Sequence, residues 1–226
     1  MALSEADLIA AGVGRDGPRR TKVIRPVAFS IRDLWAGLMG LSAYSDLLVV
    51  LSAHRLKVRY KQSMLGIAWA VIQPVALMLI YTLVFSVFTR IKTPGVPYAV
   101  FAYAALLPWT FFSTSLTNAT NGLVSHAQLV TKVYFPREIL PISYIVAALV
   151  DLLIASIVMT GLMIYYHVAL TPQALWLIPV TLVMAAFTTA CSLIFSAMQV
   201  RVRDIGMAMP LVLQLWMFGS PVVYSL

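Results

Sequence analysis

Five long apolar runs follow one another along most of the chain. They cover residues 66–88, 98–121, 139–166, 176–198 and 205–224. A run of about 20 apolar residues crosses the ~30 Å hydrocarbon core of a bilayer as a single helix. Apolar and polar positions do not alternate strictly within these runs, which excludes the strands of a membrane barrel. The pattern therefore predicts an all-α fold, a polytopic bundle of transmembrane helices.

A shorter helix is predicted ahead of the first run. Its apolar positions recur at helical spacing, and Arg55, Lys57, Arg59 and Tyr60 occupy its second half. It is too short and too charged at one end to span a bilayer, so we expect an amphipathic helix in the cytoplasmic interface. It either anchors the first span by its positive charge or contacts lipid or a partner subunit. The chain thus divides into a cytoplasmic arm (1–41), the interfacial helix (42–65) and a transmembrane domain (66–226).

Composition and charge placement agree with a membrane protein and set its orientation. The chain of 226 residues is 61% apolar and only 11% charged, whereas a soluble domain has roughly 25% charged residues. A soluble enzyme and a disulfide scaffold are excluded, since Cys191 is the only cysteine. Of the 16 basic residues, ten precede the first span, and of the rest only Arg90 and Lys92 fall in a predicted outer loop. This bias places the N-terminus in the cytoplasm and accounts for the net charge without nucleic acid.

Five short strings carry a resemblance to a known family. They are KVRYKQS at 57–63 with Leu65-Gly66, LPWTFF at 107–112, LVTKVYFPR at 129–137, VRVRD at 200–204 and SPVVY at 220–224. Their order and spacing resemble the membrane subunits of bacterial ABC-type polysaccharide exporters, over about residues 50–226. Members of that family export O-antigen, capsule or teichoic-acid chains carried on a lipid.

The resemblance implies partners and a location. It implies a homodimer of this chain in the bacterial inner membrane, working with two copies of a separate P-loop ATPase subunit on lipid-linked polysaccharide. The chain itself has no Gly-x-x-x-x-Gly-Lys-Ser/Thr string, so ATP and Mg²⁺ are expected on the partner, and no cofactor or metal is expected here. The family has six spans, so the resemblance also implies that the last span is missing from this sequence and that its C-terminus lies outside.

The resemblance assigns two cytoplasmic contacts with the ATPase. The first is a coupling helix that contains Leu129, Val130, Lys132, Val133, Tyr134 and Arg137, and the second is the loop with Arg201, Arg203 and Asp204. Leu129, Val130 and Val133 can form the apolar face of a short helix ended by Pro136. Taken without the resemblance, the first segment would be an ordinary loop with positive-inside charge.

The second run changes from apolar to polar in its cytoplasmic half. At 100° per residue, its polar residues fall within an arc of about 140° on one side of the helix. They are Thr110, Ser113, Thr114, Thr117, Asn118 and Asn121, with Trp109, Phe111 and Phe112 beside them. Small hydroxyl residues commonly pack membrane helices together. The alternative is that the stripe and the aromatic residues line a path for a sugar polymer, whose hydroxyls and C–H faces suit both.

Asp151 is the one charged residue inside a predicted span. It lies about 18 Å along the third span, near the membrane centre, where a carboxylate costs about 2.5–3.5 kcal/mol unless it faces protein or water. Its helical neighbours Ala147, Ala148 and Ala155 predict close contact with another helix. Asp151 has either a packing role or a role in the channel or its gating.

The preferred function is the transmembrane subunit of an ATP-driven exporter of lipid-linked polysaccharide. An ABC exporter of drugs or other lipids is the near alternative. A membrane-embedded transferase or an ion-coupled carrier is the alternative from a different class, but a carrier needs several intramembrane ionisable groups and an enzyme needs a polar cluster at one membrane face.

Overall fold

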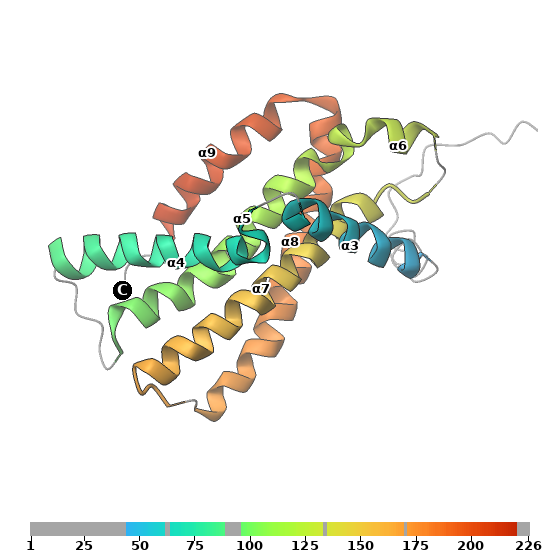
Figure 1. Cartoon of the computed structure of the whole chain (residues 1–226). Coiled ribbons are helices and arrows are strands. Elements are labelled where there is room, and N and C mark those ends of the chain that lie inside the picture. Colours follow the sequence, from blue (N-terminus) through green and yellow to red (C-terminus); the bar gives the residue numbers. More distant parts are fainter. Residues whose placement is uncertain (1–43, 62–63, 89–95, 133–134, 170, 221–226) are drawn as a thin grey trace, which may run out of the picture. The chain divides into compact units, whose positions relative to one another are not determined.

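The computed structural model describes residues 44–61, 64–88, 96–132, 135–169 and 171–220, and the described part is built from helices without strands (Figure 1). In chain order the elements are α3 (Ser45–Lys61), η1 (Gly66–Ala68), α4 (Trp69–Tyr81), η2 (Thr82–Phe88), α5 (Tyr98–Ser125), α6 (Ala127–Lys132), α7 (Ile139–Tyr165), η3 (Pro172–Trp176), α8 (Leu177–Arg201) and α9 (Asp204–Gly219). The all-α class predicted from the apolar runs is confirmed.

Four helical segments are long and apolar enough to cross a bilayer. They are Gly66–Phe85, Tyr98–Ser125, Ile139–Tyr165 and Ala174–Arg201, and each coincides with a predicted span. The fifth predicted span begins as the apolar helix α9, which has 16 residues, and its last part, 221–224, lies outside the described residues. A helix of 28 residues, such as α5, is about 42 Å long, so it extends beyond a ~30 Å hydrocarbon core.

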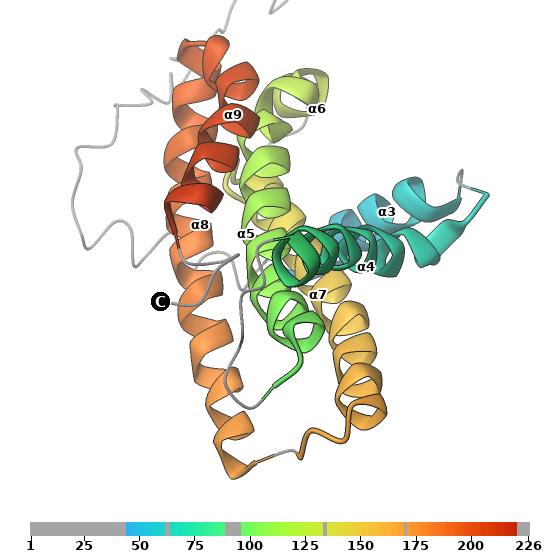
Figure 2. The same ribbon diagram turned by 90° about the vertical axis from the view of Figure 1, so that its left-hand side faces the viewer.

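Helix α5 is the centre of the bundle. It contacts α4, α7, α8 and α9, and the two views show it enclosed by these helices (Figures 1 and 2). Its side chains Tyr103, Leu106 and Leu116 are almost fully buried. Ala119 is buried as well, and so small a side chain allows a neighbouring helix to approach closely. The polar stripe of α5 lies on a less buried side of this helix, since all six of its residues are half-buried.

The first span begins at a glycine in a left-handed conformation. Gly66 has a φ of +50°, a left-handed conformation that costs glycine little and other residues more. Helix α3, which precedes this glycine in the chain, lies against the bundle and contacts α7. The structure has a helix, α3, where the sequence predicts an interfacial amphipathic one, and its location at a membrane interface stays a prediction. Ser52 is buried, whereas Val50 and Val58 are 64% and 50% exposed, so polar residues of α3 face the bundle.

Candidate functional site

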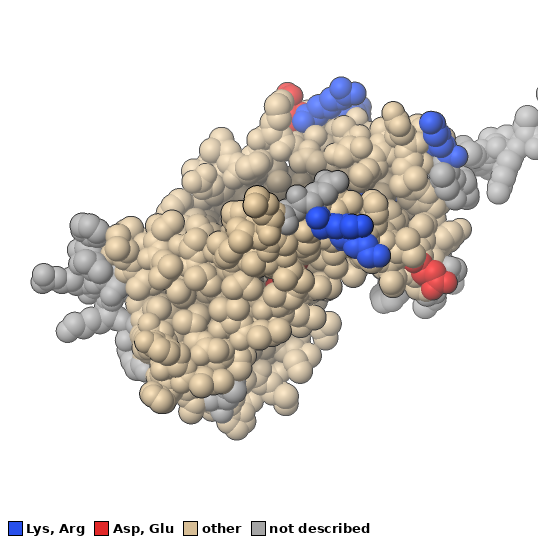
Figure 3. Space-filling model, viewed as in Figure 1, with Lys and Arg blue, Asp and Glu red and all other residues tan. Residues whose placement is uncertain are grey.

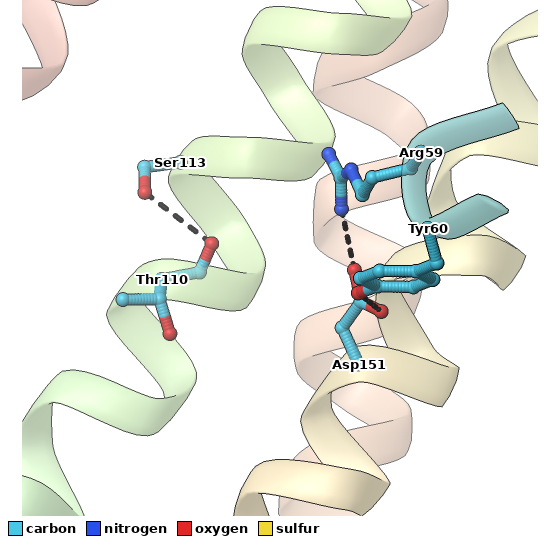
Figure 4. Close-up of polar contacts among 5 residues, drawn as sticks. All are labelled: Arg59, Tyr60, Thr110, Ser113 and Asp151. Atoms are coloured by element: carbon cyan, nitrogen blue, oxygen red, sulfur yellow. Dashed lines mark hydrogen bonds and ion pairs between the residues drawn. The ribbon is translucent and has the colours of Figure 1, made fainter. Parts of the chain in front are cut away.

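Asp151 contacts two residues of helix α3. One oxygen of its carboxylate forms an ion pair with Arg59 at 2.5 Å, and the other accepts a hydrogen bond from the Tyr60 hydroxyl at 2.5 Å. Figure 4 shows both side chains reaching Asp151 from α3, with Thr110 and Ser113 on the neighbouring helix α5. We call Arg59, Tyr60 and Asp151 the charged junction. It joins a helix outside the spans to the middle of the third span.

The environment of the charged junction keeps Tyr60 protonated. Burial, followed by the hydrogen bond to Asp151, raises the pKa of Tyr60 to about 12. The phenol therefore stays a donor at physiological pH, and the carboxylate keeps two partners. The ion pair is only partly shielded from solvent, because the Arg59 side chain is 42% exposed and the Asp151 side chain 18%. Solvent can therefore compete for Arg59.

A cavity of about 260 Å³ opens beside the charged junction. We call it the aspartate cavity. Its lining combines the charged junction with hydroxyl, amide and aromatic groups from α4 and α5, namely Trp69, Gln73, Thr110, Phe111 and Thr114. A space with hydrogen-bonding groups and aromatic faces in an otherwise apolar bundle suits a ligand that has hydroxyls and apolar C–H faces.

Arg55 makes a second link between α3 and the bundle. Its guanidinium lies 3.3 Å above the centre of the Tyr144 ring, and its Nε donates a hydrogen bond to the Ser143 hydroxyl at 2.8 Å. Another of its nitrogens lies 3.4 Å from Nε2 of His126. His126 directly follows α5 and precedes α6, so Arg55 connects the interfacial helix with the α5–α6 corner.

A second cavity, of about 310 Å³, lies around Arg55. We call it the arginine cavity. It shares Arg59, Thr114 and Ala148 with the aspartate cavity. His54, Arg55 and His126 also line it, without an acidic residue. The pKa of His126 is lowered by burial and then by the nearby positive charges of α3, so the imidazole stays neutral beside Arg55 at neutral pH.

The residues of the polar stripe of α5 are divided between the aspartate cavity, the arginine cavity and positions that line neither. Thr110 and Thr114 line the aspartate cavity, and Asn118 lines the arginine cavity. Ser113 and Thr117 line neither of the two. The Ser113 hydroxyl donates to the backbone oxygen of Thr110 at 3.4 Å.

The aromatic residues next to the stripe separate in the same way. Phe111 lines the aspartate cavity, whereas Trp109 and Phe112 face the α8–α9 side of the bundle. The Phe112 ring packs against Trp109 and against Trp216 of α9, with centroids 6.0 and 5.5 Å apart. The sequence grouped all three aromatic residues with the sugar path, and the structure brings only Phe111 to the charged junction.

The residues expected to contact an ATPase lie at exposed ends of helices. Helix α6 covers Ala127–Lys132, with Leu129 37% exposed and Val130 half-buried. The predicted contacts Val133 and Tyr134 lie outside the described residues, and Arg137 is exposed. In Figure 3 basic side chains gather chiefly over α3, at the end of α6 and at the α8–α9 turn.

The pairing of α3 with α7 was not predicted, although the sequence holds a signal for it. Arg55 and Arg59 are four residues apart and share one face of α3, and Ser143 and Asp151 are eight apart and share one face of α7. These spacings allow Arg55 and Arg59 to pair with Ser143 and Asp151. They do not show that α3 and α7 touch, so the pairing follows only once that contact is known. The small face around Asp151 was predicted correctly, since Ala147, Ala148 and Ala155 are buried.

Among the described residues, no three His, Cys, Asp or Glu side chains cluster in a way that could hold a metal ion. The two cavities are lined by one carboxylate and by guanidinium, imidazole, hydroxyl and amide groups from different helices. Such a lining suits recognition and passage of a polar molecule.

Comparisons with known proteins agree with the resemblance carried by the five strings. The model of a family described as ABC-2 type transporter matches residues 46–226. The chain is 35% identical over 189 residues to the O-antigen export system permease protein RfbA of Myxococcus xanthus, across 81% of this chain and 70% of that protein. Two proteins of the same name from Klebsiella pneumoniae are 33% and 31% identical over 181 residues, each across 80% of this chain and 69% of the relative. The matched region includes both cavities. The chain therefore belongs to the ABC-2 type transporter family, as a multi-pass membrane subunit.

Proposed function

We propose that this chain is the transmembrane subunit of an ATP-driven exporter of lipid-linked polysaccharide in the bacterial cytoplasmic membrane. It works as a homodimer with two separate ATPase subunits that bind ATP and Mg²⁺. The relatives named O-antigen export system permease protein support the polysaccharide as substrate. The observation that carries the proposal is the aspartate cavity, a polar and aromatic space in an apolar bundle.

The two cavities give the proposal a mechanism. Hydroxyl and amide groups from α4 and α5 form hydrogen bonds with sugar hydroxyls, and the aromatic rings of Trp69 and Phe111 pack against sugar C–H faces. A half-open lining of this kind favours sliding over tight capture. The half-exposed ion pair of the charged junction lets α3 part from α7 and return.

In this mechanism the ATPase subunits act on the cytoplasmic ends of the helices. The N-terminus is cytoplasmic, in keeping with the placement of the basic residues. The ATPase subunits dock on α6 and on the α8–α9 turn, and their closure on ATP moves both. The chain is a transporter subunit, and its residues make and break no covalent bond.

Export by the full complex tests the proposal directly. The full chain and its ATPase subunit are placed in vesicles with labelled lipid-linked polysaccharide, and arrival of the polymer on the far side is followed with and without ATP. We expect transport only with ATP and the ATPase subunit. Transport that proceeds without any nucleotide would overturn the proposal.

A pair of variants tests whether the polymer contacts the cavities during export. Thr114 lines both cavities, so Thr114→Val removes a hydroxyl at almost constant volume. We expect the export rate to fall by about two- to tenfold, the equivalent of one hydrogen bond. The control is Thr160→Val, because the exposed Thr160 hydroxyl lines neither cavity and donates to the backbone oxygen of Ser156 in its own helix at 3.1 Å. Equal export rates of the two variants would contradict the proposal that the polymer passes through the cavities.

A further inference from the structure

The side chain of Gln199 lies at the turn between α8 and α9 and belongs to neither cavity described above. It is only 4% exposed. Its Oε1 accepts a hydrogen bond from the backbone N–H of Gly206 at 2.5 Å. Its Nε2 donates to the backbone oxygen of Arg203 at 3.1 Å and to Oδ1 of Asn121 at 3.3 Å. One amide therefore connects α8, the first turn of α9 and the polar stripe of α5.

This network uses the hydrogen-bonding capacity of Gln199 almost completely. Both N–H groups and one acceptor site of the amide have partners. The Gly206 N–H is one of the amide groups that the first turn of a helix leaves without a partner inside the helix. No side chain at Arg203, the residue before α9, caps the helix. Gln199 supplies that cap from the preceding helix.

Space at the turn is as restricted as its hydrogen bonding. A Cβ added at Gly206 would meet the side-chain amides of Asn121 and Gln199 closer than van der Waals contact allows. Asn121 is itself held, because its Nδ2 donates to the backbone oxygen of Thr117 at 3.1 Å. We call Asn121, Gln199, Gly206 and the Arg203 backbone oxygen the amide junction.

The amide junction lies directly beneath an exposed charged turn. Arg201, Arg203 and Asp204 are all exposed, and Figure 3 shows basic and acidic side chains together at the edge where Figure 1 places the α8–α9 turn. Arg203 thus presents its side chain outward while its backbone oxygen accepts from Gln199. A force on the exposed turn reaches Gln199 through the backbone of Arg203 itself.

We propose that Gln199 is a positioning residue that fixes the α8–α9 turn to α5, so that a displacement of the turn by the ATPase moves the polar stripe of α5 with it. The inference rests on the proposed function, since it needs an ATPase docked on the turn. Its physical basis is that a buried neutral amide with three hydrogen bonds, to α5, to the α8–α9 turn and to α9, has one favourable geometry. Sliding the turn past α5 would leave buried donors and acceptors without partners.

Two variants separate this link from simple capping of α9. Asn121→Ala removes the link to α5 and leaves the bonds from Gln199 to Gly206 and Arg203, whereas Gln199→Ala removes everything. In the full complex with its ATPase subunit, polymer exported per ATP hydrolysed is measured for each variant and for the double variant. The matched control is Gln214→Ala, an exposed glutamine of α9. Membrane abundance and the thermal unfolding midpoint are recorded for every variant.

The expected result is a coupling loss shared by the two variants. We expect each single variant to lower export per ATP by about fivefold or more, the lower end of usual coupling energies. The double variant should be no worse than Gln199→Ala, because both remove one link. An unchanged ratio in Asn121→Ala, or losses that multiply in the double variant, would overturn the proposal. Failure of the unaltered complex to export with ATP would instead overturn the proposed function.

A distance measurement tests the same idea without altering Gln199. In a Cys191→Ser background, spin labels on Ser125→Cys of α5 and Met207→Cys of α9 report the distance between two exposed sites of these helices with and without ATP. We expect one distance in both states, because the helices move together, and a nucleotide-dependent distance once Asn121→Ala is added. A distance that changes with ATP while Asn121 is intact would overturn the proposal.

Discussion

The bundle contains two polar junctions with different chemistry. The charged junction joins α3 to α7 through an ion pair and a hydrogen bond to Asp151, and Arg59 is 42% exposed there. The amide junction joins α5, α8 and α9 through neutral groups around Gln199, which is 4% exposed. Cavities adjoin the charged junction, whereas the amide junction has no room for one methyl group at Gly206.

The charged junction and the amide junction together show how one membrane protein can combine a movable contact between helices with a fixed one. An ion pair with one half-exposed partner is partly screened by salt and solvent, so separating it costs less than separating a fully buried pair. A buried amide network has no water to replace its lost partners, so it resists separation. In the proposed exporter the first property suits a helix that makes way for the substrate, and the second suits a lever.

The largest effect on stability is expected from Gly206→Ala. The added methyl group displaces the amides of Asn121 and Gln199 and breaks the amide junction. We expect a loss of about 3 kcal/mol in the free energy of unfolding, from overpacking and lost hydrogen bonds. Denaturant titration of the purified protein in detergent measures it.

The control for Gly206→Ala is Gly161→Ala. Nothing lies within 4 Å of a Cβ added at Gly161, which is in the α7 helix. Alanine there should leave stability unchanged or raise it by up to about 1 kcal/mol. Equal stability of the two alanine variants would contradict the tight packing of the amide junction.

A smaller loss is expected at the charged junction. Arg59→Ala leaves Asp151 with Tyr60 as its hydrogen-bond partner, and we expect a loss of about 2 kcal/mol, below the value for fully buried pairs because Arg59 is 42% exposed. Adding Asp151→Ala should recover part of the loss, since no unpaired carboxylate then remains. Lys57→Ala, an exposed lysine of the same helix, is the control. The prediction fails if the losses of Arg59→Ala and Asp151→Ala simply add.

The smallest effect is a pH dependence at the α5–α6 corner. Burial, then Arg55 and His54 of α3, lower the pKa of His126 below 6.5, and the Tyr144 hydroxyl of α7 lies 3.3 Å from its Nε2. The unfolded chain then binds more protons than the folded one below about pH 6.5, so stability falls as the pH drops through that value. His126→Asn should flatten the fall in thermal unfolding midpoint between pH 7.5 and 5.5.

His167 provides the matched control for this pH series. It is exposed, far along the chain from the α5–α6 corner, with a φ of 55° that asparagine also adopts readily. His167→Asn should keep the pH dependence of the unaltered protein. If His126→Asn and His167→Asn titrate alike, protonation of His126 has no part in holding α3 to the bundle.

The membrane spans could be predicted because lipid, as the solvent of these segments, restricts the structures that they can form. Apolar runs in the sequence must form helices in lipid, where every backbone polar group needs a partner within the segment. The first four predicted spans therefore coincide with observed helices. The family also followed from short strings that stand in a fixed order, and the comparisons agree with it.

The partners of single side chains could not be predicted in the same way. The position of Asp151 in a span required a partner, but any of several basic residues could have supplied it, and the packing of α3 against α7 makes Arg59 that partner. Gln199 gave no signal, because a glutamine near a helix end is common and its role depends on Asn121, 78 residues earlier.

The sequence by itself determined that this protein is a helical membrane subunit with a basic helix ahead of its spans, because hydrophobicity and charge act locally along the chain. Only the tertiary structure decided which polar residues meet, where the cavities open and which junction is closed to solvent. Those properties depend on distances between helices, which packing sets and no local pattern encodes.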